Sequence, residues 1–185
     1  MADIVIETER LVLRKHQDGD LPLHAKHLNT PAVMARLGGP MELQEIEARH
    51  AKSLALFARE GFGFMPVIEK GTGELVGQVG LKRVDAELAR NKGDFEIGWL
   101  IREDRWRMGY AFEAMRAVLD WAFERFQAPL VVALTSEANE PSWRLMQKLG
   151  MVRRTDLDFE DDRFPPEDNP TILYSISRAE WEKAR

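Results

Sequence analysis

One long amphipathic segment constrains the fold of this chain more than any other feature. Between Tyr110 and Phe126, apolar residues recur every three or four positions, which is the spacing of one face of an α-helix. Pro129 ends this predicted helix, because proline cannot continue one. The runs on either side, Phe95 to Ile101 and Leu130 to Thr135, are typical of strands, and the second is apolar enough to be buried on both faces.

Shorter signals predict further strands. Leu11 to Arg14 is a first strand, and Phe64 to Arg83 is a hairpin, because two apolar runs flank the turn Lys70-Gly71-Thr72-Gly73. Met151 to Asp158 and Thr171 to Ser177 are closing strands around an acidic loop.

Two further helical regions precede the hairpin. The stretch from Asp18 to about Leu37 is partly helical, with interruptions at Pro22 and Pro31. Glu42 to Arg59 has helical spacing and ends before Gly61. The residues expected on or near its apolar side are Ile46, Ala51, Leu54 and Ala58.

A last helix opens at Asn139-Glu140-Pro141, with a capping asparagine and a proline in the first turn, and Gly150 closes it. The order is then strands, strand–helix–strand–helix, and strands again. This order predicts an α/β fold with a mixed sheet flanked by helices.

Composition limits what such a fold can do. The 185 residues are 44% hydrophobic and carry no linker or repeat, so we expect one domain over residues 1–185. The absence of cysteine excludes disulfides, thiolate zinc sites and a cysteine nucleophile. With 26 basic against 31 acidic residues, the net charge of −5 argues against DNA or RNA as the main partner. The apolar runs are too short to span a membrane, and Met1 to Lys15 lacks a secretory stretch, so a cytoplasmic location is expected.

The loop entering the long helix has the character of an anion site. The first four N–H groups of a helix lack intrahelical partners and carry partial positive charge, so a phosphate could bind at Trp106 to Ala111. Three nearby arginines, Arg102, Arg105 and Arg107, would add positive charge. The alternative is that Gly109 only starts the helix and the arginines are a solvated patch. No Rossmann or P-loop motif is present.

Four segments together resemble the GNAT superfamily of acyl-CoA-dependent N-acetyltransferases, in particular the branch of ribosomal-protein N-terminal acetyltransferases. Glu7 to Arg14 looks like the first strand of that branch, and Glu96 to Ile101 looks like its fourth. Trp106 to Ala111 matches the pyrophosphate loop. The last helix is matched by Asn139-x-x-Ser142 and by Lys148 to Met151. These matches follow the family order over nearly the whole chain.

The resemblance implies a mostly antiparallel mixed sheet of about seven strands, with a splayed parallel pair that forms the acetyl-CoA cleft and no metal. Backbone groups near Trp99 would pair with pantetheine, and the Trp99 N–H would polarise the thioester carbonyl. The implied cofactor-binding residues are Trp99, Leu100, Ile101, Trp106, Arg107, Met108, Gly109, Tyr110, Ala111, Asn139 and Ser142. Transfer would be direct, in a ternary complex. Dimers are frequent in this family, so a homodimer is compatible with the resemblance.

Two residues depart from the family pattern. Arg107 stands where the pyrophosphate loop commonly has glycine, although its backbone donor remains. Many members carry a tyrosine on the last helix that protonates the departing thiolate, and the matching residue here is Met146, which cannot donate a proton. Ser142, one turn earlier, is the family-like substitute for this acid, unless its hydroxyl satisfies the backbone instead.

The acceptor must be an uncharged amine. An α-amine is roughly a tenth free base at pH 7 and a lysine well under a thousandth, a difference of about 3 kcal/mol, so an α-amine needs little help. Glu96 is the candidate base, because a charged residue on an apolar central strand should face a cavity; the alternative is a paired or solvated carboxylate at a frayed strand start. The preferred acceptor by resemblance is a protein N-terminus; alternatives are a small-molecule amine, or a non-catalytic acyl-CoA-binding module.

The loop from Asp156 to Asp168 carries seven acidic residues and one arginine. It would draw a cationic acceptor such as a basic peptide to the cleft, or it is a mobile, solvated loop. The four histidines show no metal-like spacing and are assigned surface or packing roles: His16, His24, His27 and His50. Trp121 and Trp143 are expected to pack within helices.

Overall fold

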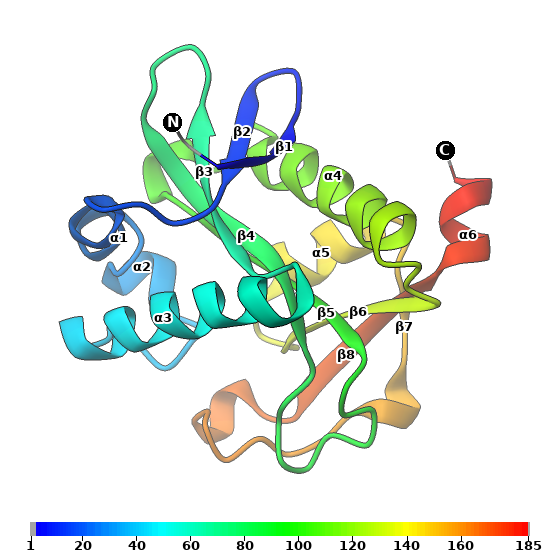
Figure 1. Cartoon of the computed structure of the whole chain (residues 1–185). Helices are drawn as coiled ribbons and strands as arrows, with labels where there is room; N and C mark the ends of the chain where they lie inside the picture. Colours follow the sequence, from blue (N-terminus) through cyan, green and yellow to red (C-terminus); the bar gives the residue numbers. More distant parts are fainter. Residues whose placement is uncertain (1–2, 185) are drawn as a thin grey trace.

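The computed structural model describes residues 3–184 and contains one eight-stranded sheet in the order β1-β2-β3-β4-β5-β6-β8-β7 (Figure 1). All neighbouring strands are antiparallel except β5 and β6, which are parallel. The strands are β1 (Ile4–Glu7), β2 (Leu11–Arg14), β3 (Phe64–Glu69), β4 (Leu75–Arg83), β5 (Phe95–Ile101), β6 (Leu130–Ser136), β7 (Val152–Arg153) and β8 (Thr171–Ser177). The predicted mixed sheet with one parallel pair is confirmed. It has one strand more than expected, because the segment before Thr8 pairs with β2.

Within residues 3–184, six α-helices flank the sheet: α1 (Asp20–His27), α2 (Pro31–Met34), α3 (Leu43–Glu60), α4 (Tyr110–Arg125), α5 (Glu140–Lys148) and α6 (Arg178–Lys183). Helix α4 is the long amphipathic segment, and it packs against β4 and β5. Four apolar side chains of the predicted face are fully buried: Met115, Val118, Leu119 and Ala122. No helix within residues 3–184 is long and apolar enough to cross a membrane.

Strand register decides which side chains share a face of the sheet. Glu96 lies opposite Lys82, and Leu100 lies opposite Gln78, so these four side chains project to the same side. Helices α1 and α3 cover that side, because His24 of α1 and His50 of α3 lie together beside Gln78.

The predicted buried face of α3 is wrong, because the helix is rotated about its axis relative to the prediction. Its buried residues are Ile46, His50, Ser53 and Phe57, whereas Ala51, Leu54 and Ala58 are exposed. Two polar residues can be buried because they have partners: the Ser53 hydroxyl bonds both the N–H and the C=O of Phe64, and His50 contacts His24.

Two other boundaries differ from the sequence predictions. Pro22 does not interrupt a helix, since it lies in the first turn of α1, where its missing N–H would be unpaired anyway. The strand predicted over Met151 to Asp158 is only β7, because the chain turns into the short 3₁₀ helix η2 (Thr155–Leu157).

Candidate active site

Strands β5 and β6 separate soon after they meet. They pair only at Phe95 with Val131 and at Glu96 with Val132, although β5 continues to Ile101 and β6 to Ser136. Beyond those pairs, the facing backbone edges of the two strands have no partner in each other. We call this stretch the β5–β6 opening, and it is the splayed parallel pair that the resemblance implied.

The backbone of β5 offers hydrogen-bond groups to this opening. The Arg102 N–H donates to the Val76 carbonyl on β4, so by alternation the peptide groups of Leu100 also face β4. The N–H groups of Trp99 and Ile101 therefore point away from β4, toward the opening. The Ile101 carbonyl already accepts a bond from the indole Nε1 of Trp106 at 2.7 Å, a contact that sequence analysis missed.

The loop between β5 and α4 presents a run of free N–H groups. The Trp106 N–H is used, since it donates to the Glu103 carbonyl, but those of Arg107, Met108 and Gly109 find no acceptor within residues 3–184. Tyr110 and Ala111 begin α4, where N–H groups lack intrahelical partners. These five donors lie beside a helix N-terminus, where an anion is favoured, and binding of an anion there stays a prediction.

Two of the three nearby arginines are neutralised. Arg102 pairs with Glu74 and Asp104, and Arg105 pairs with Glu74. Arg107 is exposed and has no ion pair in the described part of the chain, so the positive charge at the loop comes mainly from this residue and the helix end.

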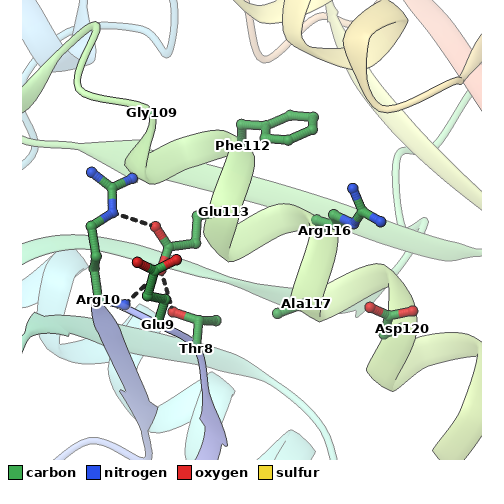
Figure 2. Close-up of a pocket in the computed structure, with 9 residues that line it drawn as sticks. All are labelled: Thr8, Glu9, Arg10, Gly109, Phe112, Glu113, Arg116, Ala117 and Asp120. Atoms are coloured by element: carbon green, nitrogen blue, oxygen red, sulfur yellow. Dashed lines mark hydrogen bonds and ion pairs between the residues drawn. The ribbon is translucent and has the colours of Figure 1, made fainter. Parts of the chain in front are cut away.

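The start of α4 is clamped by the loop before β2. The Thr8 hydroxyl donates to Oε1 of Glu113 at 2.6 Å, and Nε of Arg10 lies 2.6 Å from Oε2 (Figure 2). Nη1 of Arg10 also donates to the Met108 carbonyl, and its guanidinium lies 4.5 Å from the ring centroid of Tyr110. The Tyr110 hydroxyl in turn donates to Glu69. Sequence reasoning did not single out Glu113; the one signal was an acidic residue in the first helical turn.

A surface hollow of about 430 Å³ lies beside this clamp (Figure 2). Its lining comes from the loop before β2 and from one side of α4: Thr8, Glu9, Arg10, Gly109, Phe112, Glu113, Arg116, Ala117 and Asp120. No residue of β5 or β6 lines it, so this hollow is separate from the β5–β6 opening.

Helix α5 begins just after β6 and carries the other predicted residues. Asn139 is its N-cap, but its side chain makes no capping bond. The Ser142 hydroxyl is partly buried and forms no hydrogen bond within the described residues, so it does not satisfy the backbone as the alternative suggested. Met146 lies one turn further and is 1% exposed, within the core.

Glu96 lies at the last paired position before the opening. Its side chain is 12% exposed, and Oε2 lies 3.1 Å from Nζ of Lys82. Burial raises the pKa of the Glu96 carboxyl, and the ammonium of Lys82 acts against that rise. The carboxylate is therefore paired, as one alternative held, and is not solvated.

The acidic loop has internal hydrogen bonds, and part of its negative charge is paired with arginines. Its core is the Asn169 side chain, which accepts from the Asp161 N–H and donates toward three carbonyls, those of Asp161, Phe164 and Pro165. Four of its acids have cationic partners, through the pairs Asp156–Arg154, Asp158–Arg153, Asp161–Arg163 and Asp168–Arg36. Asp168 also accepts from Ser136, which ties the loop to the end of β6.

Three of the four histidines pack together between α1 and α3. The rings of His16 and His50 stack with centroids 4.0 Å apart, and Nε2 of His50 lies 3.3 Å from Nδ1 of His24. Within residues 3–184, no group of three or more potential ligands is arranged to hold a metal ion.

A parted strand pair thus lies next to a helix N-terminus with unpaired N–H groups, an arrangement suited to an anion. Residues 10–152 match the family described as the acetyltransferase (GNAT) domain. The chain therefore belongs to the GNAT family and is an acyl-CoA-dependent N-acetyltransferase. It is 33% identical over 147 residues to YkkB of Bacillus subtilis, an uncharacterized protein. The matched region covers 78% of this chain and 83% of that relative.

Solved structures agree with this assignment. An acetyltransferase from Agrobacterium tumefaciens is 29% identical, with a TM-score of 0.75 and 94% coverage of both chains. Two others are similar in fold alone. RimL, a ribosomal L7/L12 α-N-protein acetyltransferase, is 13% identical, with a TM-score of 0.77 and coverage of 96% and 95%. Spermidine N-acetyltransferase from Vibrio cholerae, solved with CoA and spermine, is 18% identical, with a TM-score of 0.74 and coverage of 95% and 99%.

Proposed function

We propose that this enzyme transfers an acetyl group from acetyl-CoA to a primary amine, preferably the α-amine at the N-terminus of a protein or peptide, in a ternary complex. The observation that carries the acetyl-CoA assignment is the coincidence of two unpaired backbone edges: the β5–β6 opening and the free N–H groups from Arg107 to Ala111. The first fits a pantetheine arm, and the second fits a pyrophosphate.

In this proposal the acceptor amine approaches from the side of the sheet that carries Glu96. Glu96 takes a proton from the bound ammonium, and the free amine attacks the thioester carbonyl carbon. The Trp99 N–H stabilises the developing oxyanion. The carbon–sulfur bond then breaks, and the thiolate leaves with a proton from the Ser142 hydroxyl, which has no competing bond within the described residues. The nitrogen of the new amide gives up its own extra proton, which returns to the Ser142 oxygen. Asn139 contacts the pantetheine near its sulfur.

An α-amine suits this site because the catalytic apparatus is small. A single partly buried carboxylate, already paired with Lys82, is a modest base. At pH 7 the free-base fraction of an α-amine exceeds that of a lysine by a factor equivalent to about 3 kcal/mol. The likeness of fold to RimL agrees with this preference for an α-amine, and the preference does not depend on that likeness.

A second candidate acceptor is a polyamine or another small cationic amine. Three acids of the C-terminal loop, Glu160, Asp162 and Glu167, are exposed and have no cationic partner within the described residues. This excess negative charge would favour a cationic acceptor by long-range attraction.

The test is thiol release from acetyl-CoA with three acceptors: a peptide with a free N-terminus and no lysine, the same peptide with its N-terminus blocked, and spermidine. We expect turnover with the first only. Faster turnover of spermidine would select the second candidate. Binding of CoA without thiol release from any amine would identify a non-catalytic acyl-CoA-binding module. The variant Ser142→Ala should slow release at least tenfold, and an unchanged rate would remove Ser142 from the mechanism.

A further inference from the structure

The carboxylate of Glu96 has one cation directly beside it. Lys82 occupies the position opposite Glu96 in the β4–β5 register, so both side chains emerge on the same face. Nζ of Lys82 lies 3.1 Å from Oε2 of Glu96 in an ion pair, yet Oε2 accepts no well-aligned hydrogen bond within residues 3–184. Oε2 is itself buried, so Lys82 stabilises the charge of the carboxylate from inside the protein, and the 12% of the Glu96 side chain that is exposed is the part that an acceptor can reach.

Lys82 is itself held in place from the other side. Its ammonium donates to Oδ1 of Asp85 at 2.9 Å, just beyond the end of β4. Asp85 also accepts from Lys52 of α3 at 2.8 Å and lies 3.6 Å from Nη1 of Arg163 in the C-terminal loop. One carboxylate thus joins β4, α3 and the C-terminal loop behind Glu96.

The charges in this group compensate one another. Glu96, Asp85 and Asp161 carry the negative charges, and they face Lys82, Lys52 and Arg163. Burial raises the pKa of Glu96, and its neighbour Asp85 adds to the rise, while Lys82 and Arg163 oppose it. Burial would also raise the pKa of Asp85, but the bonds from Lys52 and Lys82 hold it well below its usual range. Asp85 therefore stays ionised as the anchor for Lys82.

We propose that Lys82 is a positioning residue for Glu96, fixed by Asp85, that keeps the carboxylate ionised and oriented so that it can accept a proton from the acceptor. The inference rests on the proposed role of Glu96 as the base. An ammonium beside a partly buried carboxylate stabilises its charged form, and its loss shifts the carboxyl toward the protonated form, which cannot accept a proton.

The test is the variant Lys82→Met, which keeps an unbranched side chain of similar length and removes its charge. Asp85 keeps Lys52 and Arg163 as partners, so we expect the protein to fold. The titration midpoint of Glu96, followed by carboxyl-carbon NMR on ¹³C-glutamate-labelled protein, should rise by about one to three pH units. Lys82→Arg should restore the midpoint to within about half a unit of the wild-type value, since it keeps the charge.

Lys52→Met is the matched control, because it removes a cation from Asp85 without touching Glu96. Its midpoint shift should be less than a third of that in Lys82→Met. We expect the acidic limb of the pH profile of kcat/KM to follow the NMR midpoint in the wild type, in Lys82→Met and in Lys52→Met. The profile is measured with the best amine of the panel. An unchanged midpoint in Lys82→Met overturns the inference. A raised midpoint with an unchanged pH profile supports control of the carboxylate by Lys82 and rejects Glu96 as the base, so the two failures are distinguishable.

Discussion

Arg10 and Glu113 lie far apart in the sequence, but two hydrogen bonds join them. The Arg10 backbone N–H donates to Oε1 of Glu113 at 2.8 Å, and its Nε lies 2.6 Å from Oε2. The same carboxylate accepts from the Thr8 hydroxyl. The contact fixes the first turn of α4, and Nη1 of Arg10 extends it to the Met108 carbonyl in the loop. The first-strand motif and the loop motif are therefore one structural unit.

Replacing Glu113 by alanine should destabilise the protein by about 2–3 kcal/mol, because it leaves a charged group and two further donors without their acceptor. The free energy of unfolding from urea titration measures this. The affinity for CoA should fall as well, since the loop from Trp106 to Gly109 is no longer held by Arg10 through Glu113. Glu103→Ala is the control, because that exposed side chain makes no hydrogen bond within the described residues; it should change stability by less than about 0.5 kcal/mol. Equal effects of the two variants would contradict the clamp.

The backbone at Arg107 favours glycine. Its φ of 63° lies in the left-handed region, which costs a residue with a side chain about 1–2 kcal/mol. Arg107→Gly should therefore be about 1 kcal/mol more stable than Arg107→Ala, although glycine usually destabilises relative to alanine. Both variants lose the same guanidinium, so the difference in Tm between them reports the backbone alone. An alanine variant as stable as the glycine variant would show that the loop is not strained there.

The bond from Trp106 to Ile101 should affect binding of acetyl-CoA and not the chemical step. Trp106→Phe keeps an aromatic ring but loses the indole donor. A bond of about 1 kcal/mol corresponds to a KM for acetyl-CoA that is about fivefold higher, with kcat unchanged within twofold. The matched control is Met108→Leu, another half-exposed apolar residue of the loop. A change in kcat alone would contradict this assignment.

The histidine cluster should make stability depend on pH. Burial, and then the neighbouring His50, lower the pKa of His24 to about 4, against 6.5 for its unperturbed value, and the same causes act on His16. Between these values the unfolded chain binds more protons, so stability is fully present above pH 6.5 and is lost as the pH falls toward 4. His24 alone should account for about 2 kcal/mol between pH 7 and pH 5.

His24→Gln should remove about that part of the pH dependence, as measured by urea unfolding at pH 7 and pH 5. His27→Gln should remove a smaller part, because the ring of His27 lies outside the cluster. If the wild type and His24→Gln lose the same free energy on acidification, the cluster is not the cause.

The Asn169 side chain should hold the C-terminal loop. Asn169→Ala removes its bonds to Asp161, Phe164 and Pro165, and we expect a loss of about 1–3 kcal/mol. Limited proteolysis should then cut between Glu160 and Asp168, where the wild type resists. Glu167→Ala, an exposed change in the same loop, should leave the loop resistant. Cleavage of the wild type at the same rate as Asn169→Ala would restore the alternative of a mobile loop.

Local regularities allowed much of the fold to be read from the sequence. The period of α4, the strand β5 and the turn after β3 depend on residues near one another in the chain, and the structure has all three within a residue of their predicted ends. The free N–H groups of the loop that enters α4 also depend on nearby residues alone, because a glycine-bearing turn into a helix leaves such groups without intrahelical partners. The resemblance added the parting of β5 and β6, which no local pattern indicated.

The sequence by itself therefore determined the main helices and strands, the loop that enters α4 and, through the resemblance, the family. Only the tertiary structure decided the partners of charged and polar groups: Glu113 with Arg10, Glu96 with Lys82, and His24 with His50. Which face of α3 is buried depends on such partners too, so a prediction from hydrophobicity alone chose the wrong face. The physical reason is that burying a polar group is favourable only when a specific partner, often distant in sequence, lies within bonding distance, and the folded chain alone sets that distance.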